Sequence, residues 1–282
     1  MRVQVLLCVM AVGLGGCAPS PKNTTAARQE AALEANRRGE NYVRHGELEN
    51  AARSYREALR LSQSLEDPEG IAANAINLSI VRQRQGRFAD ARASLGAVME
   101  QPNLRFSPLR LSEAALRHAL LDLDERRFGT AGKWLTQAQT HCGERCPLAG
   151  AIHNVRAQLA LQAGRVDDAA AAARSALEAS RATGERSETA NALRLLGISA
   201  LQRGEAAAAR AHLEQALALD RELGAPRKIA LDLLALGRAA ALSGERDAAR
   251  AYYARALAVS EADRDHAGAA EARAMLDAAT GK

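Results

Sequence analysis

The stretch HCGERCP, residues 141–147, brings two cysteines close together in the chain. The spacing of Cys142 and Cys146 suits a disulfide, a pair of free thiols or half of a zinc site. Zinc needs four ligands, and His141 and His153 are the local candidates for the other two. The spacing alone does not choose among these chemistries, because the choice depends on whether the compartment is oxidising.

The N-terminus indicates the compartment. The chain begins MRVQVLLCVMAVGLGGCAPS, in which Arg2 precedes an apolar run from Val3 to Leu14 and small residues precede Cys17. This order is typical of a signal peptide. A membrane-spanning helix needs about 20 apolar residues, and this run is shorter. We therefore expect residues 1–16 to be a signal peptide that is removed on export.

The stretch Leu14-Gly15-Gly16-Cys17 resembles the bacterial lipobox. The resemblance implies that Cys17 is lipidated and becomes the first residue of the mature protein, which then contacts the membrane through this anchor. Each buried methylene contributes about 0.8 kcal/mol, so several acyl chains hold firmly. Ala18 stands where an Asp would favour the inner membrane, which implies the outer membrane, with the folded part facing the periplasm. The alternative is an ordinary secretory signal that happens to precede a cysteine.

The cysteine count then favours a disulfide. The chain has four cysteines, of which Cys8 leaves with the signal and Cys17 carries lipid. Cys142 and Cys146 remain as a pair in a compartment that permits disulfides. Free thiols and a zinc site stay open as alternatives.

Composition and charge narrow the class of protein. The chain has 38 basic and 33 acidic residues with no basic run, which does not suggest nucleic acid as a partner. Aromatic residues make up 3%, so the core must be built from Ala and Leu on closely packed helices. Residues 17–28 contain two prolines and read as a polar tether. From Gln29 onward, helical spacing of Ala and Leu predicts an all-α chain.

Six segments of the chain repeat the same pattern. The predicted helix-to-helix turn recurs at steps of 40, 40, 38, 40 and 40 residues, at Gly46, Gly86, Arg126, Gly164, Gly204 and Gly244. Glycine suits a left-handed turn. Seven residues before each turn residue lies a small residue of the first helix: Gly39, Ser79, Ala119, Ala157, Gly197 and Gly237. This pattern predicts that the two helices of each repeat approach closely.

The second helix of each repeat carries a matching pattern. Alanine recurs five residues after the turn residue, at Ala51, Ala91, Ala131, Ala169, Ala209 and Ala249. Four residues further on are the residues expected to fill the space beside the small residues of the first helix: Tyr55, Leu95, Leu135, Ala173, Leu213 and Tyr253. Repeat four, with Ala173, has the smallest of these side chains.

These positions resemble the tetratricopeptide repeat, whose pattern is W-x2-L-G-x2-Y, then A-x3-F, then P. Repeat six shows the resemblance in Leu236, Gly237, Ala249 and Tyr253. The period near 40 exceeds the usual 34, and the first-helix Trp is absent. The resemblance implies a right-handed α-solenoid over residues 29–264 and a capping helix and tail over 265–282. The expected repeats span about 31–62, 71–101, 109–141, 149–181, 188–221 and 228–261.

The resemblance also implies a concave groove lined by the first helices, in which a protein or an extended peptide lies. The positions carried over from the family are Asn36, Glu40, Arg44, Ile76, Ile80, Gln83, Glu113, Leu116, Leu120, Asn154, Gln158, Asn191, Arg194, Ile198, Leu234 and Arg238. The family's clamp for a C-terminal carboxylate wants an Asn where Glu40 stands, so we do not expect chaperone tails as ligands.

Familiar catalytic motifs are absent from the sequence, which lacks a phosphate-binding loop, a metalloprotease helix and a nucleophile elbow. We expect no metal and no cofactor. The sequence predicts a non-enzymatic, membrane-anchored scaffold that assists assembly of an outer-membrane pilus or secretion complex. An adaptor for peptidoglycan hydrolases or periplasmic proteases is the alternative. An enzyme using the region of His118 and His153 is the alternative from another class.

Overall fold

The computed structural model describes residues 24–143 and 146–280, and this part of the chain forms thirteen α-helices and no strand. The helices are α1 (Thr24–Arg44), α2 (Leu48–Ser64), α3 (Pro68–Arg84), α4 (Phe88–Met99), α5 (Pro108–Asp124), α6 (Phe128–Cys142), α7 (Ala149–Gln162), α8 (Val166–Thr183), α9 (Arg186–Gln202), α10 (Ala206–Glu222), α11 (Pro226–Leu242), α12 (Arg246–Ala262) and α13 (His266–Thr280). The predicted lipidation site, Cys17, lies outside the described residues.

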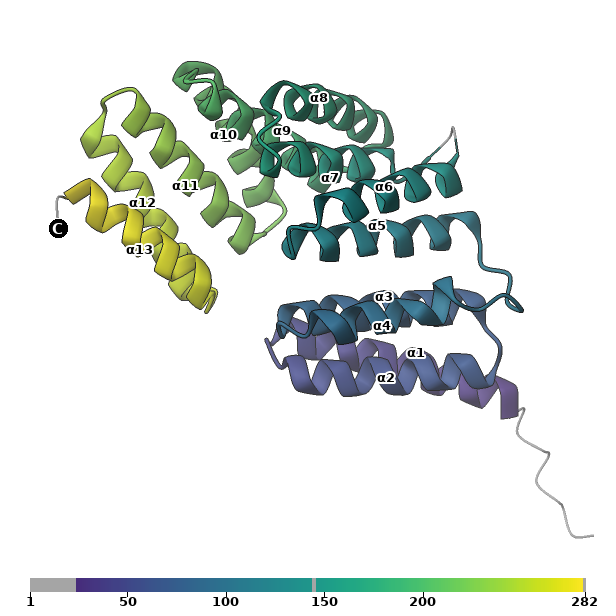
Figure 1. The fold of residues 1–282 in the computed structure, drawn as a ribbon. Coiled ribbons are helices and arrows are strands. Elements are labelled where there is room, and N and C mark those ends of the chain that lie inside the picture. The colour runs from purple at the N-terminus through teal and green to yellow at the C-terminus, as the bar shows by residue number, and fades with distance from the viewer. Residues whose placement is uncertain (1–23, 144–145, 281–282) are drawn as a thin grey trace, which may run out of the picture.

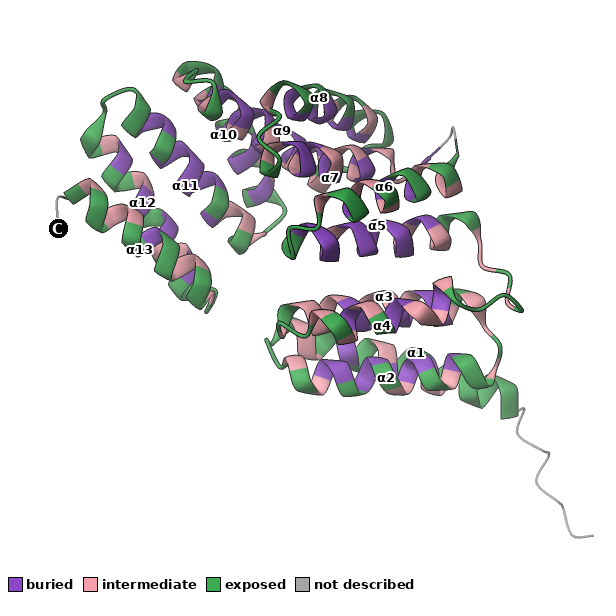
Figure 2. Ribbon diagram, in the orientation of Figure 1, coloured by how far each residue is buried: buried purple, intermediate pink, exposed green. Residues whose placement is uncertain are grey.

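Consecutive helices stack in pairs that follow one another along an arc, with α1 at one end and α13 at the other (Figure 1). The first helices of the pairs are α1, α3, α5, α7, α9 and α11, and α13 packs on the last pair. The buried residues run along the middle of the array, most visibly on α5 and α11 (Figure 2). The predicted all-α solenoid of six helix-turn-helix repeats with a C-terminal capping helix is confirmed.

The turns within the repeats are left-handed, as the glycines predict. Gly46, Gly164 and Gly204 have φ angles of 74°, 73° and 78°, and Arg126 adopts the same conformation with φ of 57°. The turn ends the first helix by bonds back to its last carbonyls: in repeat five, Gly204 N donates to Leu201 O at 3.0 Å. A second set of left-handed residues lies after the second helices and was not predicted: Glu66, Gly184, Gly224 and Arg264.

The close approach of the two helices in each repeat is also confirmed. A Cβ atom placed on Gly39 would lie 2.7 Å from Cε1 of Tyr55, and one placed on Gly197 would lie 2.5 Å from Cγ of Leu213. The Tyr253 ring occupies the same space beside Gly237. The recurring alanines of the second helix are buried in all six repeats. The large side chain of the second helix therefore takes the volume that the small residue of the first helix leaves free.

The start of α1 differs from the sequence prediction. α1 begins at Thr24, so residues 24–28 are helical although we expected a tether there; Ala26, Ala27 and Arg28 favour helix. α4 is short and ends at Met99, and residues 100–107 connect it to α5. α7 begins at Ala149, as expected for repeat four; Pro147 precedes it by two residues, whereas Pro68, Pro108 and Pro226 each stand at the first position of a helix.

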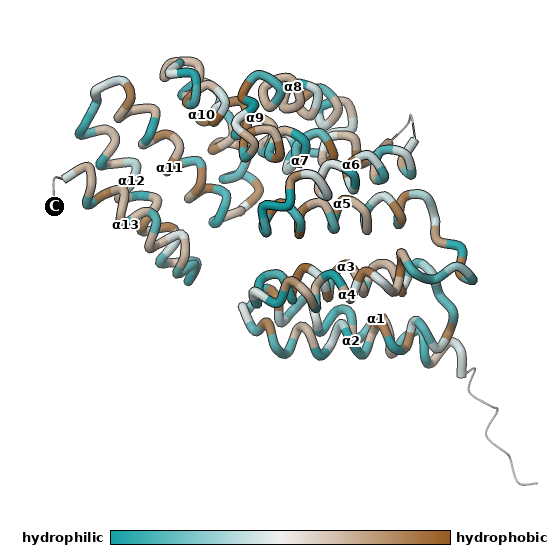
Figure 3. Tube along the Cα trace, in the orientation of Figure 1, coloured by the Kyte–Doolittle hydropathy of each residue, from teal (hydrophilic) through white to brown (hydrophobic). Residues whose placement is uncertain are grey.

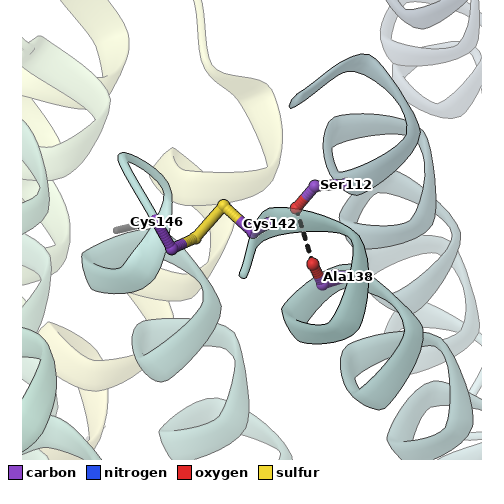
Figure 4. Close-up of a disulfide and its surroundings, with 4 residues drawn as sticks. All are labelled: Ser112, Ala138, Cys142 and Cys146. Atoms are coloured by element: carbon purple, nitrogen blue, oxygen red, sulfur yellow. Dashed lines mark hydrogen bonds between the residues drawn. A yellow bond between two sulfur atoms is a disulfide. The ribbon is translucent and has the colours of Figure 1, made fainter. Parts of the chain in front are cut away.

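Cys142 and Cys146 are joined by a disulfide in the structure, with their Cα atoms 4.9 Å apart (Figure 4). Cys142 is the last residue of α6, and Cys146 precedes α7, so the bond ties repeat three to repeat four. Nearby, the Ser112 hydroxyl on α5 donates a hydrogen bond of 2.8 Å to the Ala138 carbonyl on α6. Within residues 24–143 and 146–280, no group of three or more His, Cys, Asp or Glu side chains is placed to hold a metal ion.

Every helix carries hydrophobic and hydrophilic residues side by side along its length (Figure 3). Among the helices that the structure describes, none combines the length and the apolar character needed to cross a membrane.

We predict that Gly197→Ala lowers the free energy of unfolding by about 1–3 kcal/mol, because the new methyl group meets Leu213 and the backbone of Ala209. Gly129→Ala is the matched control: Gly129 lies in α6 with no atom near its Cβ position, so alanine there stabilises by about 0.5–1 kcal/mol. Urea unfolding followed by circular dichroism measures both. Equal effects of the two substitutions would contradict the close approach.

We predict that replacing both Cys142 and Cys146 with Ser lowers stability by about 2 kcal/mol, because so short a loop restrains little of the unfolded chain. Thermal unfolding of the periplasmically expressed protein with and without reductant measures the effect. Mass spectrometry of unreduced peptides checks the bond itself, and recovery of two free thiols from fresh protein would show that the disulfide does not form.

Candidate functional site

The first helices line two adjoining cavities on one face of the solenoid. The larger cavity has a volume of about 550 Å³ and is lined by residues of α5, α7, α9, α11 and α13. The smaller has a volume of about 430 Å³ and is lined by residues of α3 and α5. Leu116 and Leu120 line both cavities, so the two lie next to each other. We refer to the two cavities together as the groove.

The structure brings together a large share of the predicted groove residues. Those that line the groove are Ile76, Ile80, Glu113, Leu116, Leu120, Asn154, Gln158, Asn191, Arg194, Ile198, Leu234 and Arg238. Their binding role stays a prediction. Asn36, Glu40, Arg44 and Gln83 line neither cavity. Asn36 instead donates a hydrogen bond of 2.7 Å to Asn74 of the next repeat, and Gln83 donates one to Asp124.

Sequence reasoning missed one groove position that recurs in five repeats. The residue nine positions before the turn residue lines the groove in α3, α5, α7, α9 and α11: Asn77, Arg117, Val155, Leu195 and Ala235. Because this position keeps the phase of the repeat, it could have been found from the turn residues alone. Its side chains lie between neighbouring first helices.

The larger cavity is lined by side-chain amides and by aliphatic side chains. The Asn154 amide nitrogen donates to the Glu188 backbone carbonyl at 2.9 Å and to Glu188 Oε2 at 2.8 Å, and Asn191 donates to the same Oε2 at 3.2 Å. Asn154 Oδ1 is buried and has no hydrogen-bond partner among the described residues. Leu195 and Ile198 are two of the aliphatic side chains. Such a surface can bond a peptide backbone and hold aliphatic side chains.

Arg194 lines the larger cavity, yet its charge is already used within the fold. Its Nε donates to Asp232 Oδ1 at 2.6 Å, and its Nη2 donates to Asp220, whose side chain is fully buried, as is that of Asp232. The charge of Arg194 is therefore paired within the fold, and its predicted role in binding stays a prediction. The two carboxylates come from α10 and α11, and no motif in the sequence pairs them with Arg194.

The buried carboxyl of Asp232 holds its proton unusually well. Burial raises the pKa of Asp232 to about 7, and the neighbouring Asp220 carboxylate adds to the rise against the opposing effect of Arg194. One guanidinium cannot neutralise two buried carboxylates. Other groove charges are paired at the surface: Arg238 donates to Glu271 of α13 at 2.8 Å.

The two histidines considered for catalysis occupy different surroundings. His118 is buried and stacks on Trp134 with ring centroids 4.2 Å apart. Burial lowers the pKa of His118 to about 4, so its imidazole is neutral at physiological pH. His153 is half-buried, and its Nδ1 lies 3.4 Å from Nη1 of Arg156. We assign His118 a packing role against Trp134.

We predict that Asp232 makes the free energy of unfolding of the wild-type protein fall as the pH rises from about 4 to about 7. The contribution of this one group is at most about 1.4 kcal/mol per pH unit. The folded state keeps the Asp232 proton up to about pH 7, whereas the unfolded chain has lost it, so the unfolded state binds fewer protons in this window. The difference in slope between wild type and Asp232→Asn, from urea unfolding between pH 5 and pH 7, isolates the effect. Asp247→Asn, at an exposed position on α12, retains the wild-type slope. Parallel curves for wild type and Asp232→Asn would refute the assignment.

Comparison with known proteins gives a partial match in sequence. The tetratricopeptide repeat model matches residues 148–222 and 188–262, which correspond to repeats four to six. Comparison with curated protein sequences gave no match.

Three solved structures illustrate the similarity in fold. BtubC (BKLC) from P. vanneervenii is 21% identical with a TM-score of 0.58, over 84% of this chain and 92% of that chain. A Rap protein complexed with Competence and Sporulation Factor is 14% identical with a TM-score of 0.61, over 92% of this chain and 77% of the Rap protein chain. A signal transduction ATPase with a tetratricopeptide repeat sensor, from Pyrococcus horikoshii, is 15% identical with a TM-score of 0.65, over 93% of this chain but 41% of its own. Residues 148–262 thus match the tetratricopeptide repeat in sequence, and the described chain has the all-α solenoid fold of the proteins that contain this repeat.

Proposed function

We propose that the protein is an interaction scaffold whose groove binds an extended segment of a partner protein. The observation that carries the proposal is that two adjoining cavities together extend from α3 to α13, along five first helices and the cap. A volume of about 550 Å³ in the larger cavity falls within the usual range of ligand sites.

The chemistry of the groove supports a peptide ligand. Side-chain amides of Asn154 and Gln158 on α7 and of Asn191 on α9 lie in two consecutive repeats and suit hydrogen bonds to a peptide backbone. Leucine and isoleucine side chains between them suit shallow apolar contacts. The Rap protein of similar fold is complexed with Competence and Sporulation Factor, which is consistent with a solenoid of this kind holding a ligand.

We further propose that the scaffold is held at the outer membrane, facing the periplasm, by lipid on Cys17. The sequence Leu14-Gly15-Gly16-Cys17 supports this location. Anchoring would raise the local concentration of groove and partner without adding any contact. The partner class we favour is a subunit of a pilus or secretion complex under assembly, and hydrolases or proteases of the envelope are the alternative partners.

Crosslinked co-purification of the lipidated protein from outer-membrane fractions tests the location and the partner class together. Cys17→Ser is the unanchored control. Pilus or secretion subunits that are recovered with the wild type and lost with the control support the proposal. Hydrolases or proteases in their place would favour the adaptor, and an unchanged membrane fraction for Cys17→Ser would contradict the anchor.

We predict that Leu231→Glu weakens partner binding by roughly ten-fold, because it places a charge in the apolar part of the groove. Leu231 lies on α11 and is 44% exposed, so the substitution leaves the core unchanged. Leu223→Glu is the matched control, since Leu223 is 40% exposed and lies at the end of α10, outside the groove. Quantitative recovery of the crosslinked partner measures both, and equal losses would place the binding surface elsewhere.

A further inference from the structure

The groove changes character along its length, and this change bears on the ligand that the proposed function requires. At the position nine residues before the turn residue, α3 and α5 carry Asn77 and Arg117. At the same position, α7, α9 and α11 carry Val155, Leu195 and Ala235. A bound segment that spans the groove therefore meets a polar surface at one end and an apolar surface at the other.

Arg117 is a buried cation without a partner in the fold. The residue is 9% exposed, and its buried Nε and Nη2 atoms have no hydrogen-bond partner among the described residues. Burial lowers the pKa of Arg117 to about 10, which leaves the guanidinium charged at neutral pH. The charge of Asp124 acts on Arg117, but the Asp124 carboxylate accepts its hydrogen bond from Gln83. The Arg117 guanidinium is thus attracted by the Asp124 carboxylate but forms no hydrogen bond with it.

The remaining charges beside the smaller cavity are satisfied. Arg110 donates to Glu69 Oε2 and to Glu113 Oε2, each at 2.7 Å. Arg194, the other arginine buried beside the groove, is bonded to two buried carboxylates. An unpaired buried charge is strongly destabilising, and native folds ordinarily supply its partner. Nε and Nη2 of Arg117 are therefore available to an anion that enters the smaller cavity.

Apolar side chains lie on both sides of Arg117. Ile76 and Ile80 of α3 line the smaller cavity on the side away from the larger one. Leu116 and Leu120 of α5 lead into the larger cavity. A ligand whose carboxylate reaches Arg117 can continue in both directions, as a segment does when the carboxylate belongs to a side chain in its interior.

We propose that the groove recognises an internal segment of a partner protein in which an Asp or Glu, flanked by aliphatic residues, pairs with Arg117. The carboxylate lies between α3 and α5, and the aliphatic residues on one side of it lie over α7, α9 and α11. This proposal rests on the proposed function of the groove and assigns the chemistry of its ligand.

Selection from a displayed library of short random peptides tests the proposal. The peptides are inserted in a loop of the carrier, so that neither terminus is free, and are selected on the full chain carrying Cys17→Ser. Enriched sequences are expected to carry one Asp or Glu with Leu, Ile or Val on both sides. Binders without an acidic residue would overturn this proposal and leave groove binding standing, whereas a complete lack of binders would overturn both.

A double-mutant cycle then measures the contact itself. An enriched peptide and its counterpart with Gln or Asn at the acidic position are titrated against wild type and Arg117→Met. The carboxylate peptide is expected to lose about ten-fold or more in affinity on Arg117→Met, because a charged hydrogen bond is lost. The amide peptide is expected to bind both proteins equally. Arg174→Gln, an exposed arginine on α8, is the control and changes neither affinity.

Two further readings decide the assignment. Arg117→Met is expected to raise the melting temperature of the unliganded protein, because methionine relieves an unpaired buried charge. A lower melting temperature would show that Arg117 has a structural partner and would overturn the proposal. Binding that requires a free peptide C-terminus, and disappears when the terminus is amidated, would overturn the assignment to an internal side chain.

Discussion

Close packing between the two helices of each repeat holds the repeat together, and in repeats one, five and six this packing sets a glycine of the first helix against a large side chain of the second. Gly39 against Tyr55 and Gly197 against Leu213 let the paired helices lie closer than larger side chains would allow. The stacking of the pairs, the left-handed turns and the line of first helices along one face all follow from repeating this contact. The groove is a by-product, because helices placed at a regular interval leave regular spaces between their exposed sides.

The periodic features of the fold could be predicted because they are local. The turn residue, the small residue and the alanine lie within a few residues of one another, so their phase is visible in the sequence. The pairing of Arg194 with Asp220 and Asp232 spans 26 and 38 residues, and these charged side chains do not recur at the same positions of the other repeats, so no repeated pattern in the sequence indicates the ion pair. Because the sequence does not reveal this ion pair, the groove residues carried over from the family included Arg194, although its guanidinium is paired with two buried carboxylates.

Two buried arginines show how the same residue type serves different ends. Arg194 is surrounded by carboxylates and fastens α9 to α10 and α11. Arg117, two repeats away, lines the smaller cavity together with Ile76, Ile80, Leu116 and Leu120, and its buried Nε and Nη2 have no hydrogen-bond acceptor among the described residues. The first arrangement is complete in the free protein. The second leaves an energetic cost in the free protein that a ligand can remove, which couples stability to binding.

The linear order of the repeats has a consequence for how the protein responds to a bound segment. In a solenoid each repeat contacts its neighbours alone, so distant repeats can fray and exchange hydrogen independently. A segment lying along the groove touches α3 and α11 at once and adds a connection that the sequence of neighbour contacts lacks. A ligand in the groove would then make the repeats unfold more cooperatively. Protection of backbone amides from hydrogen exchange would extend to repeats that the ligand barely contacts.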